Sequence, residues 1–249
     1  MLEIQNLSKH FGGVKAVDDL NLSIEPDQIF GLIGPNGSGK STTINLICGV
    51  ISATAGAVHL DGRDISGLPP HQVVAAGIGR TFQNIRLFQG LTVWQNLWVG
   101  QKEQGAQNRS GFIRSWLSGQ SNAYKSVESL LEFSALVDKR DFLAGNLSFG
   151  EQRRLELARA MATSPKLLLL DEPAAGMNPE EISQLDDRLR SLKEKGITIL
   201  LVEHVMELVM GVTDRIAVLN FGQKIAEGTP ADIQANHSVQ EAYLGQSTE

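Results

Sequence analysis

The sequence predicts an α/β fold in which buried strands alternate with helices, and three observations support this. Apolar runs of strand length occur at 29–33, 167–170 and 197–202. Continuous runs of this kind are typical of strands that are buried on both faces of a parallel sheet. An amphipathic helical pattern covers 179–195 and ends at a glycine. A glycine-rich turn, finally, joins the first apolar run to a second helical pattern.

That glycine-rich turn, at 34–42, has the spacing G-x-x-x-x-G-K-[ST] of a phosphate-binding loop. Gly37 and Gly39 can adopt positive φ and carry no Cβ, so main-chain N–H groups can turn inward around an anion. The following helix directs the positive end of its dipole to the same point. Lys40 can reach the β- and γ-phosphates, and the Ser41 hydroxyl can bind Mg²⁺. A purely structural glycine turn is the alternative, which the flanking strand and helix disfavour.

Composition narrows the class of protein. The chain has 249 residues, enough for one large α/β domain or a core with a subdomain, and its net charge of −6 argues against nucleic acid as the main partner. The lone cysteine, Cys48, is expected to be a small core residue rather than a nucleophile, and a disulfide scaffold is excluded. No apolar run is long enough for a membrane span, and the first residues are unlike a signal peptide. We therefore expect a soluble, cytosolic chain whose membrane role, if any, depends on a partner.

Shorter elements are expected around the phosphate loop. Phe11, in a turn at 10–13, can be a core aromatic or an exposed platform for a flat ring, and its position alone favours the core. The remaining predictions for this half of the chain are strands at 2–7 and 17–24, a hairpin after 56–60, a helix at 69–76 and a strand at 77–83 that ends at Gln83.

The region from 84 to 163 has a different character. Helical patterns are expected at 91–99 and 127–136, and the polar segment 101–126 between them is expected to be a loop or insert with one short amphipathic piece at 112–117. Hairpin and helical patterns close the chain at 215–227 and 230–245.

Ser148 and Glu151 are three residues apart at the start of a strong helical pattern. This spacing is a capping box, and that explanation is sufficient by itself. A serine and a glycine at a helix N-terminus can also bind an anion. Taken alone, the pattern favours the cap.

Polar side chains follow two of the buried runs. Asp171 and Glu172 come directly after one run, and His204 follows the next by one residue. Ligands of open α/β sheets bind beyond the carboxyl ends of the strands. We therefore expect these side chains to share an edge with the phosphate loop.

The ordered set of motifs resembles the ATP-binding subunits of ABC transporters over nearly the whole chain. The members of this set are GPNGSGKST (34–42), Gln83, LSFGE (147–151), LLLLDEP (167–173), AAGMNP (174–179) and His204. The resemblance implies a single ABC ATPase domain over 1–249. It implies a RecA-like phosphate-loop NTPase core at 1–83 and 164–249, an N-terminal antiparallel β subdomain, and an inserted helical signature subdomain at about 84–163.

The same resemblance implies roles for individual residues, with ATP and Mg²⁺ as cofactors. Glu172 is the general base, His204 the γ-phosphate switch, and Gln83 senses Mg²⁺ and the γ-phosphate and contacts a membrane subunit. Phe11 stacks on adenine. Mg²⁺ is held by Ser41, Gln83 and Asp171. The nucleotide-binding set is Phe11, Val17, Gly34, Pro35, Asn36, Gly37, Ser38, Gly39, Lys40, Ser41, Thr42, Ser148, Phe149, Gly150 and Glu151.

Family likeness also implies partners. Two ATP molecules are buried between two head-to-tail ATPase subunits, the second of which is a related but different chain, and residues 148–151 of each subunit close the site of the other. Two membrane permeases and, indirectly, a substrate-binding protein complete the assembly at the inner face of the cell membrane, and no nucleic acid takes part.

The likeness within this class is to bacterial importers of branched-chain or other hydrophobic amino acids. It rests on FGGVKAV (11–17), GIGRTFQNIRLF (77–88), LTVWQNL (91–97), AAGMNPEE (174–181), LVMGVTDRIAVLN (208–220) and EAYLG (241–245). Importers of urea or short amides and ATPases of lipopolysaccharide export share much of this pattern. A soluble, non-transport ABC ATPase is a further alternative, whereas a phosphate-loop GTPase is disfavoured because N-K-x-D is absent. Phe149, Glu151, Met177 and Val205 depart from common family residues without removing a catalytic atom.

Overall fold

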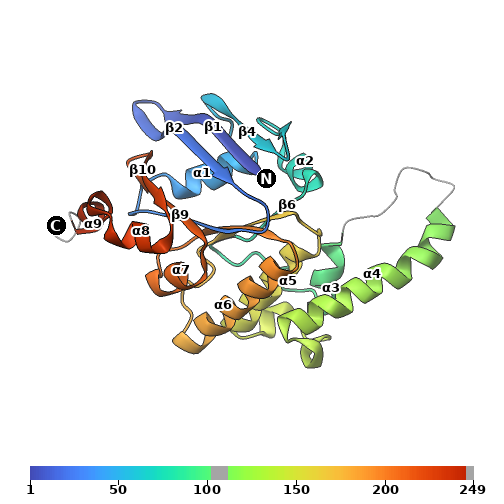
Figure 1. Cartoon of the computed structure of the whole chain (residues 1–249). Helices are drawn as coiled ribbons and strands as arrows, with labels where there is room; N and C mark the ends of the chain where they lie inside the picture. Colours follow the sequence, from blue (N-terminus) through green and yellow to red (C-terminus); the bar gives the residue numbers. More distant parts are fainter. Residues whose placement is uncertain (102–111, 245–249) are drawn as a thin grey trace. The chain divides into compact units, whose positions relative to one another are not determined.

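The computed structural model describes residues 1–101 and 112–244, with side chains described for 1–101 and 123–243. The chain divides into two compact units (Figure 1). The first consists of Met1–Arg80 and Lys166–Glu249, and the second of Thr81–Pro165. Each unit has its own apolar core.

An antiparallel sheet forms the N-terminal part of the first unit. Within residues 1–80, all of which are described, its strand order is β2-β1-β4-β5. The strands are β1 (Leu2–Phe11), β2 (Val14–Ile24), β4 (Ala55–Leu60) and β5 (Arg63–Asp64). The expected strands are confirmed, but β1 continues to Phe11, so the turn is confined to 12–13 rather than 10–13. The hairpin predicted at Asp61-Gly62 is also confirmed, since both residues have positive φ.

A second, mainly parallel sheet carries the rest of the first unit. Among the described residues its strand order is β10-β9-β3-β8-β7-β6. Its strands are β3 (Ile29–Ile33), β6 (Ile78–Arg80), β7 (Leu167–Asp171), β8 (Thr198–Val202), β9 (Arg215–Asn220) and β10 (Gln223–Gly228). Every pairing is parallel except that of β9 with β10. Each residue of β3, β7 and β8 is buried, as the continuous apolar runs predict.

One strand prediction was wrong in its extent. The strand expected at 77–83 is β6, which pairs with β7 only through Ile78, Gly79 and Arg80. Thr81 begins the second unit. Gln83 therefore lies beyond the strand, because the pairing of β6 with β7 ends at Arg80 and Leu169.

Helices accompany the parallel strands of the first unit. They are α1 (Lys40–Ile47), α2 (Pro70–Ala76), α6 (Pro179–Glu194), α7 (Met206–Val212), α8 (Pro230–Ala235) and α9 (His237–Leu244). The predicted apolar stripe of α6 is buried at Leu185, Leu189 and Leu192. Cys48, directly after α1, is buried, and burial raises the pKa of its thiol to about 11. The prediction that Cys48 is a core residue is confirmed.

The second unit is helical in its described residues. It contains α3 (Val93–Val99), α4 (Phe112–Ser134), two short 3₁₀ turns at Val137–Lys139 and Ala144–Asn146, and α5 (Phe149–Met161). Its core includes Val93, Leu97, Val127, Leu131 and Leu155.

The prediction of a loop at 101–126 was wrong in part. Residues 102–111 lie outside the described residues, but 112–126 belong to α4. Val127 and Leu131 anchor the C-terminal half of this helix in the core of the unit. Helix formation is cooperative once a turn exists, so the helix extends through residues whose own polar composition predicts a loop.

No helix among the described residues is both long enough and apolar enough to span a membrane.

Candidate active site

The phosphate loop follows β3 and leads into α1. Gly34, Gly37 and Gly39 all have positive φ, at 150°, 77° and 106°. Glycine is required at both ends of the loop, because an added Cβ would lie 2.1 Å from the Leu219 carbonyl oxygen at Gly34 and 2.4 Å from the Ala16 carbonyl oxygen at Gly39. The loop is thus packed against neighbouring main chain in a conformation that other residues adopt with strain.

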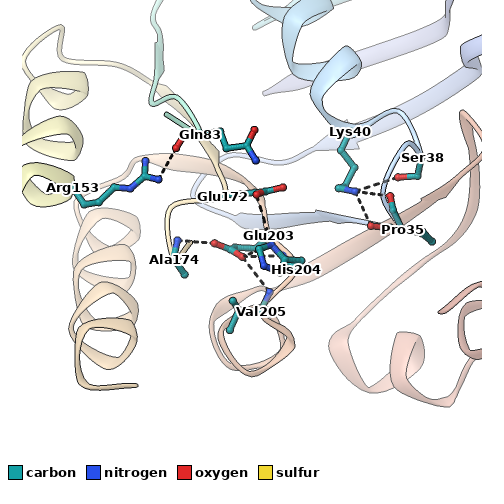
Figure 2. A network of polar contacts seen from close by, with 11 residues as sticks. Pro35, Ser38, Lys40, Gln83, Arg153, Glu172, Ala174, Glu203, His204 and Val205 are labelled. Carbon is teal, nitrogen blue, oxygen red and sulfur yellow. Dashed lines mark hydrogen bonds and ion pairs between the residues drawn. The ribbon is translucent and has the colours of Figure 1, made fainter. Parts of the chain in front are cut away.

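The side chain of Lys40 is folded into this loop (Figure 2). Its Nζ donates hydrogen bonds to the carbonyl oxygens of Gly34 and Pro35, at 2.7 and 2.8 Å, and to Ser38 Oγ at 3.4 Å. Burial lowers the pKa of the Lys40 ammonium, while the nearby carboxylates of Glu172 and Asp171 act in the opposite direction. The loop therefore holds a buried cation at the N-terminus of a helix, which suits a phosphate group.

The hairpin turn between β9 and β10 is hydrogen-bonded to the phosphate loop and supports it. Gly222 N–H donates to the Ser38 carbonyl oxygen at 3.0 Å, and Asp18 N–H donates to the Gly222 carbonyl oxygen at 2.9 Å. Gly222 has φ of 80°. Sequence reasoning identified Gly222 only as a turn residue, because nothing local indicates that the turn packs on residues 16–18 and on Ser38.

Asp171 ends β7 and is paired with a residue that the sequence did not reveal. Arg80, at the end of the neighbouring strand β6, donates from Nη2 to Asp171 Oδ2 at 3.1 Å and from Nη1 to Asn45 Oδ1 at 2.8 Å. Burial raises the pKa of the Asp171 carboxyl, and the Arg80 guanidinium opposes this, with a net upward shift. The sequence prediction placed Arg80 inside a strand that continues to Gln83, so it did not indicate that Arg80 ends the strand beside Asp171.

Glu172 and His204 are brought together at the carboxyl edge of the parallel sheet. β7 and β8 are adjacent, with Asp171 opposite Val202, and Glu172 N–H donates to the Val202 carbonyl oxygen at 2.8 Å. His204 Nδ1 lies 3.8 Å from Glu172 Oε2 (Figure 2). The His204 side chain is exposed, whereas that of Glu172 is mostly buried. A carboxylate and an imidazole that share one edge with the phosphate loop can place a base and a hydrogen-bond donor at one ligand.

Glu203 is a further residue that sequence reasoning did not single out. Its side chain is fully buried. It accepts hydrogen bonds from the main-chain N–H groups of Ala174, His204 and Val205. The sequence signal was a lone acid directly after the apolar run 197–202, which by itself is typical of a solvated strand end.

Two residues of the expected nucleotide-binding set, Phe11 and Val17, differ in exposure. Phe11 is 51% exposed, so its core interpretation was wrong and the exposed platform is the conformation found. Lys9 Nζ lies 5.0 Å from the centroid of the Phe11 ring. Val17 is fully buried, and its Cγ2 lies 3.5 Å from the position that a Cβ at Gly39 would occupy. Val17 therefore supports the loop from the protein interior, and a direct contact with nucleotide stays a prediction.

In the second unit, Ser148 and Glu151 form the predicted capping box of α5. Glu151 Oε2 accepts from Ser148 N–H at 2.9 Å, and Ser148 Oγ accepts from Glu151 N–H at 3.4 Å. Partial burial raises the pKa of the Glu151 carboxyl, but hydrogen bonds from Lys139 and Ser148 outweigh it and leave the pKa below its usual value. Phe149 is half exposed, and Gly150 is buried. The cap is confirmed, and an additional role as an anion site stays a prediction.

Gln83 belongs to the second unit as well. Its main-chain carbonyl oxygen accepts a hydrogen bond from Arg153 Nη2 at 2.5 Å (Figure 2). The main-chain carbonyl oxygen of Phe82 accepts one from Arg153 Nη1 at 3.0 Å. Arg153, on α5, thus fixes the segment that carries Gln83. The approach of Gln83 and of 148–151 to a nucleotide stays a prediction.

Comparisons with known proteins identify the family of the chain. The family model described as "ABC transporter" matches residues 17–175, and the model described as "Branched-chain amino acid ATP-binding cassette transporter" matches 223–248. The chain is 43% identical to the high-affinity branched-chain amino acid transport ATP-binding protein LivG of Escherichia coli, over 99% of this chain and 98% of that protein.

Solved structures give the same result. An ATP-binding cassette of an ABC transporter in its ADP conformation has a TM-score of 0.84 and 33% identity, with 99% of both chains covered. A dimeric post-hydrolysis cassette bound to ADP and Pi has a TM-score of 0.77 and 26% identity, with 92% of this chain and 99% of that chain covered. The chain therefore belongs to the ABC transporter family and is one of its nucleotide-binding ATPase subunits.

Proposed function

We propose that this ATPase powers the uptake of branched-chain or other hydrophobic amino acids through a membrane importer. Support comes from the likeness to LivG, which extends over 99% of the chain, and from the branched-chain family model at residues 223–248. In this proposal the chain is cytoplasmic and is bound to the inner face of the cell membrane by two permease subunits. A substrate-binding protein delivers the cargo to those permeases.

The phosphate loop binds the nucleotide in this mechanism. Main-chain N–H groups of 34–42 and the Lys40 ammonium hold the β- and γ-phosphates, and Phe11 offers an exposed ring for adenine. Glu172 accepts a proton from the attacking water, and His204 donates a hydrogen bond to the γ-phosphate. The observation that carries this assignment is the 3.8 Å separation of His204 Nδ1 and Glu172 Oε2 at the ends of adjacent strands.

The oxygen donors near the loop fit Mg²⁺. The Ser41 hydroxyl is exposed in the first turn of α1, the Asp171 carboxylate ends β7, and α1 packs against β7. Hydroxyl and carboxylate oxygens are the hard ligands that Mg²⁺ prefers. Ser41 and Asp171 would hold the ion, which when bound would neutralise charge on the phosphates. A contribution from Gln83, which belongs to the second unit, stays a prediction.

A dimer completes the site in this proposal. Ser148 Oγ is an acceptor within the cap and keeps its own hydrogen to donate, so with Gly150 N–H it suits a γ-phosphate presented by a second ATPase subunit. The dimeric relative bound to ADP and Pi supports this arrangement. Closure with ATP and opening after hydrolysis would then drive the permeases.

The catalytic assignment is tested by Glu172→Gln. We expect this variant to bind ATP normally, to lose at least about a hundredfold in kcat, and to accumulate as an ATP-bound dimer. ATPase assays and light scattering measure the two effects. Glu207→Gln, an exposed acid shortly after His204, is the control and should leave both unchanged. Normal hydrolysis by Glu172→Gln would refute the assigned base.

The cargo is tested separately. Uptake of labelled leucine and of labelled urea should be measured in a strain that lacks the gene for this chain. We expect loss of leucine uptake that the wild-type gene restores. Loss of urea uptake alone would assign the chain to a short-amide importer, and loss of neither would favour lipopolysaccharide export or a role outside transport.

A further inference from the structure

Glu203 is a buried carboxylate that lies between two loops of the site. It follows β8 directly, and its side chain is 0% exposed. Its Oε1 accepts a hydrogen bond from Ala174 N–H at 2.7 Å, and its Oε2 accepts from His204 N–H at 2.8 Å and from Val205 N–H at 3.1 Å (Figure 2). A buried carboxylate is costly unless its oxygens are satisfied, and these main-chain donors satisfy them.

Two different loops are joined by these bonds. Ala174 lies on the loop after β7, two residues beyond Glu172, whereas His204 and Val205 lie on the loop after β8. Each carboxylate oxygen of Glu203 therefore accepts hydrogen bonds from only one of the two loops. The sheet itself already aligns the ends of both strands, since Asp171 is opposite Val202. Glu203 extends that alignment beyond the last paired residues.

The loop after β7 requires such support, because Glu172 has φ of 49°. This left-handed conformation is unfavourable for a residue with a side chain and persists only where neighbouring bonds enforce it. Glu172 N–H is held by the Val202 carbonyl oxygen at 2.8 Å. On the other side of the turn, Ala174 N–H is held by Glu203. The strained residue is thus fixed between two bonds that both come from the end of β8.

We infer that Glu203 is a positioning residue that fixes the loop of Glu172 to the loop of His204. It thereby keeps the base, Glu172, at a constant distance from His204, the residue that contacts the γ-phosphate. This inference rests on the proposed roles of Glu172 and His204. Glu203 acts through main-chain N–H groups and takes no part in the chemical step. Removing its carboxylate should leave both functional side chains present but no longer held in register.

Glu203→Gln tests this with a minimal change of shape. An amide has one acceptor oxygen, and its NH₂ group cannot accept, so at least one of the two loops loses its bond. We expect the main-chain amides of the affected loop to exchange hydrogen at least about tenfold faster. We also expect kcat for ATP hydrolysis to fall by about tenfold or more, while the Kd for ATP stays within about twofold, because the contacts of Lys40 do not involve Glu203.

Asp214→Asn is the matched control. The Asp214 carboxylate also accepts a main-chain N–H, from Ile29 at 2.8 Å, but at the start of β3 and therefore at the opposite end of the parallel strands. Asp214→Asn should lower the unfolding temperature without changing kcat.

Several outcomes would overturn the inference. These are wild-type kcat in Glu203→Gln or an equal loss of kcat in Asp214→Asn. Should Glu203→Gln fail to fold, the wild-type chain still provides a test: the amides of Ala174 and His204 should exchange as slowly as those of β7 and β8, and exchange at exposed-loop rates would contradict the bonds. If Glu172→Gln keeps full activity, the proposed function fails. If it is inactive while Glu203→Gln is normal, this inference alone fails.

Discussion

Arg80 and Asp171 form an ion pair at the ends of adjacent parallel strands, with Nη2 and Oδ2 3.1 Å apart and side-chain exposures of 12% and 7%. The carboxylate that is expected to lie near the metal thus has a protein counter-ion of its own. Because both side chains are largely buried, removing one of them would leave the charge of the other with neither its partner nor full hydration.

Arg80→Met is therefore expected to destabilise the protein by about 3 kcal/mol, because it leaves a buried carboxylate without its partner. The midpoint of urea unfolding measures this effect. Arg190→Met is the control, since Arg190 pairs with Asp186 on an exposed helix face and should contribute less than about 1 kcal/mol. Equal destabilisation by the two variants would contradict the buried pair.

Lys40→Ala is expected to raise the Kd for ATP and for ADP by at least about tenfold, because the variant removes the charged donor inside the phosphate loop. Titration with a fluorescent nucleotide analogue measures the change. Lys166→Ala is the matched control, because Lys166 pairs with Asp61 at an exposed position at the start of β7. Wild-type affinity in Lys40→Ala would argue against the phosphate-binding role.

Gly222→Ala is expected to weaken nucleotide binding, because it disturbs the hydrogen bond from Gly222 N–H to the Ser38 carbonyl oxygen of the phosphate loop. An added Cβ would lie 2.7 Å from the Lys15 carbonyl oxygen, in a residue with φ of +80°. Gly62→Ala is the control, because Gly62 has φ of +75° and no atom within 4 Å of an added Cβ. Both variants should lose about 1–2 kcal/mol of stability from the left-handed conformation. The Kd for ATP should rise only in Gly222→Ala, and an equal Kd in both would show that the turn does not position the loop.

Glu151→Gln is expected to reveal a pH-dependent contribution to stability. The folded-state pKa of Glu151 lies below its ordinary value of 4.5, so its charge stabilises the fold above pH 4.5, and this contribution is lost as the pH falls further. Glutamine retains an acceptor for Ser148 N–H, so the variant mainly removes the charge that faces Lys139 and the helix N-terminus. We expect a deficit of roughly 0.5–1 kcal/mol at pH 7 that shrinks below pH 4.5.

Unfolding curves at pH 7 and at pH 3.5 measure that difference. The exposed Glu132, replaced by glutamine, serves as the control and should show no such change with pH. A deficit of the same size at both pH values would mean that the charge of Glu151 contributes nothing.

Several elements were predictable because their signals are local. The apolar runs at 29–33, 167–170 and 197–202 correspond to β3, β7 and β8, since a strand buried on both faces needs apolar residues at every position. The start of α5 was predictable from Ser148 and Glu151 alone, because a capping box is completed within four residues.

Other elements escaped prediction because they depend on distant parts of the chain. The length of β6 follows from its pairing with β7, and the start of α4 follows from residues that are anchored in a core formed by separate helices. Phe11 was assigned to the core from its position, but β1 leads it to an exposed end of the strand.

The sequence alone determined that the chain holds a phosphate loop and a set of acids after buried strands, because glycine spacing, a lysine and apolar runs act within a few residues. Only the tertiary structure decided which side chains meet. The sheet order places β8 between β3 and β7, and that non-local pairing brings Glu172 to His204, joins their loops through Glu203, and sets Arg80 beside Asp171. Strand order is set by packing across the whole domain, so no single stretch of sequence contains it.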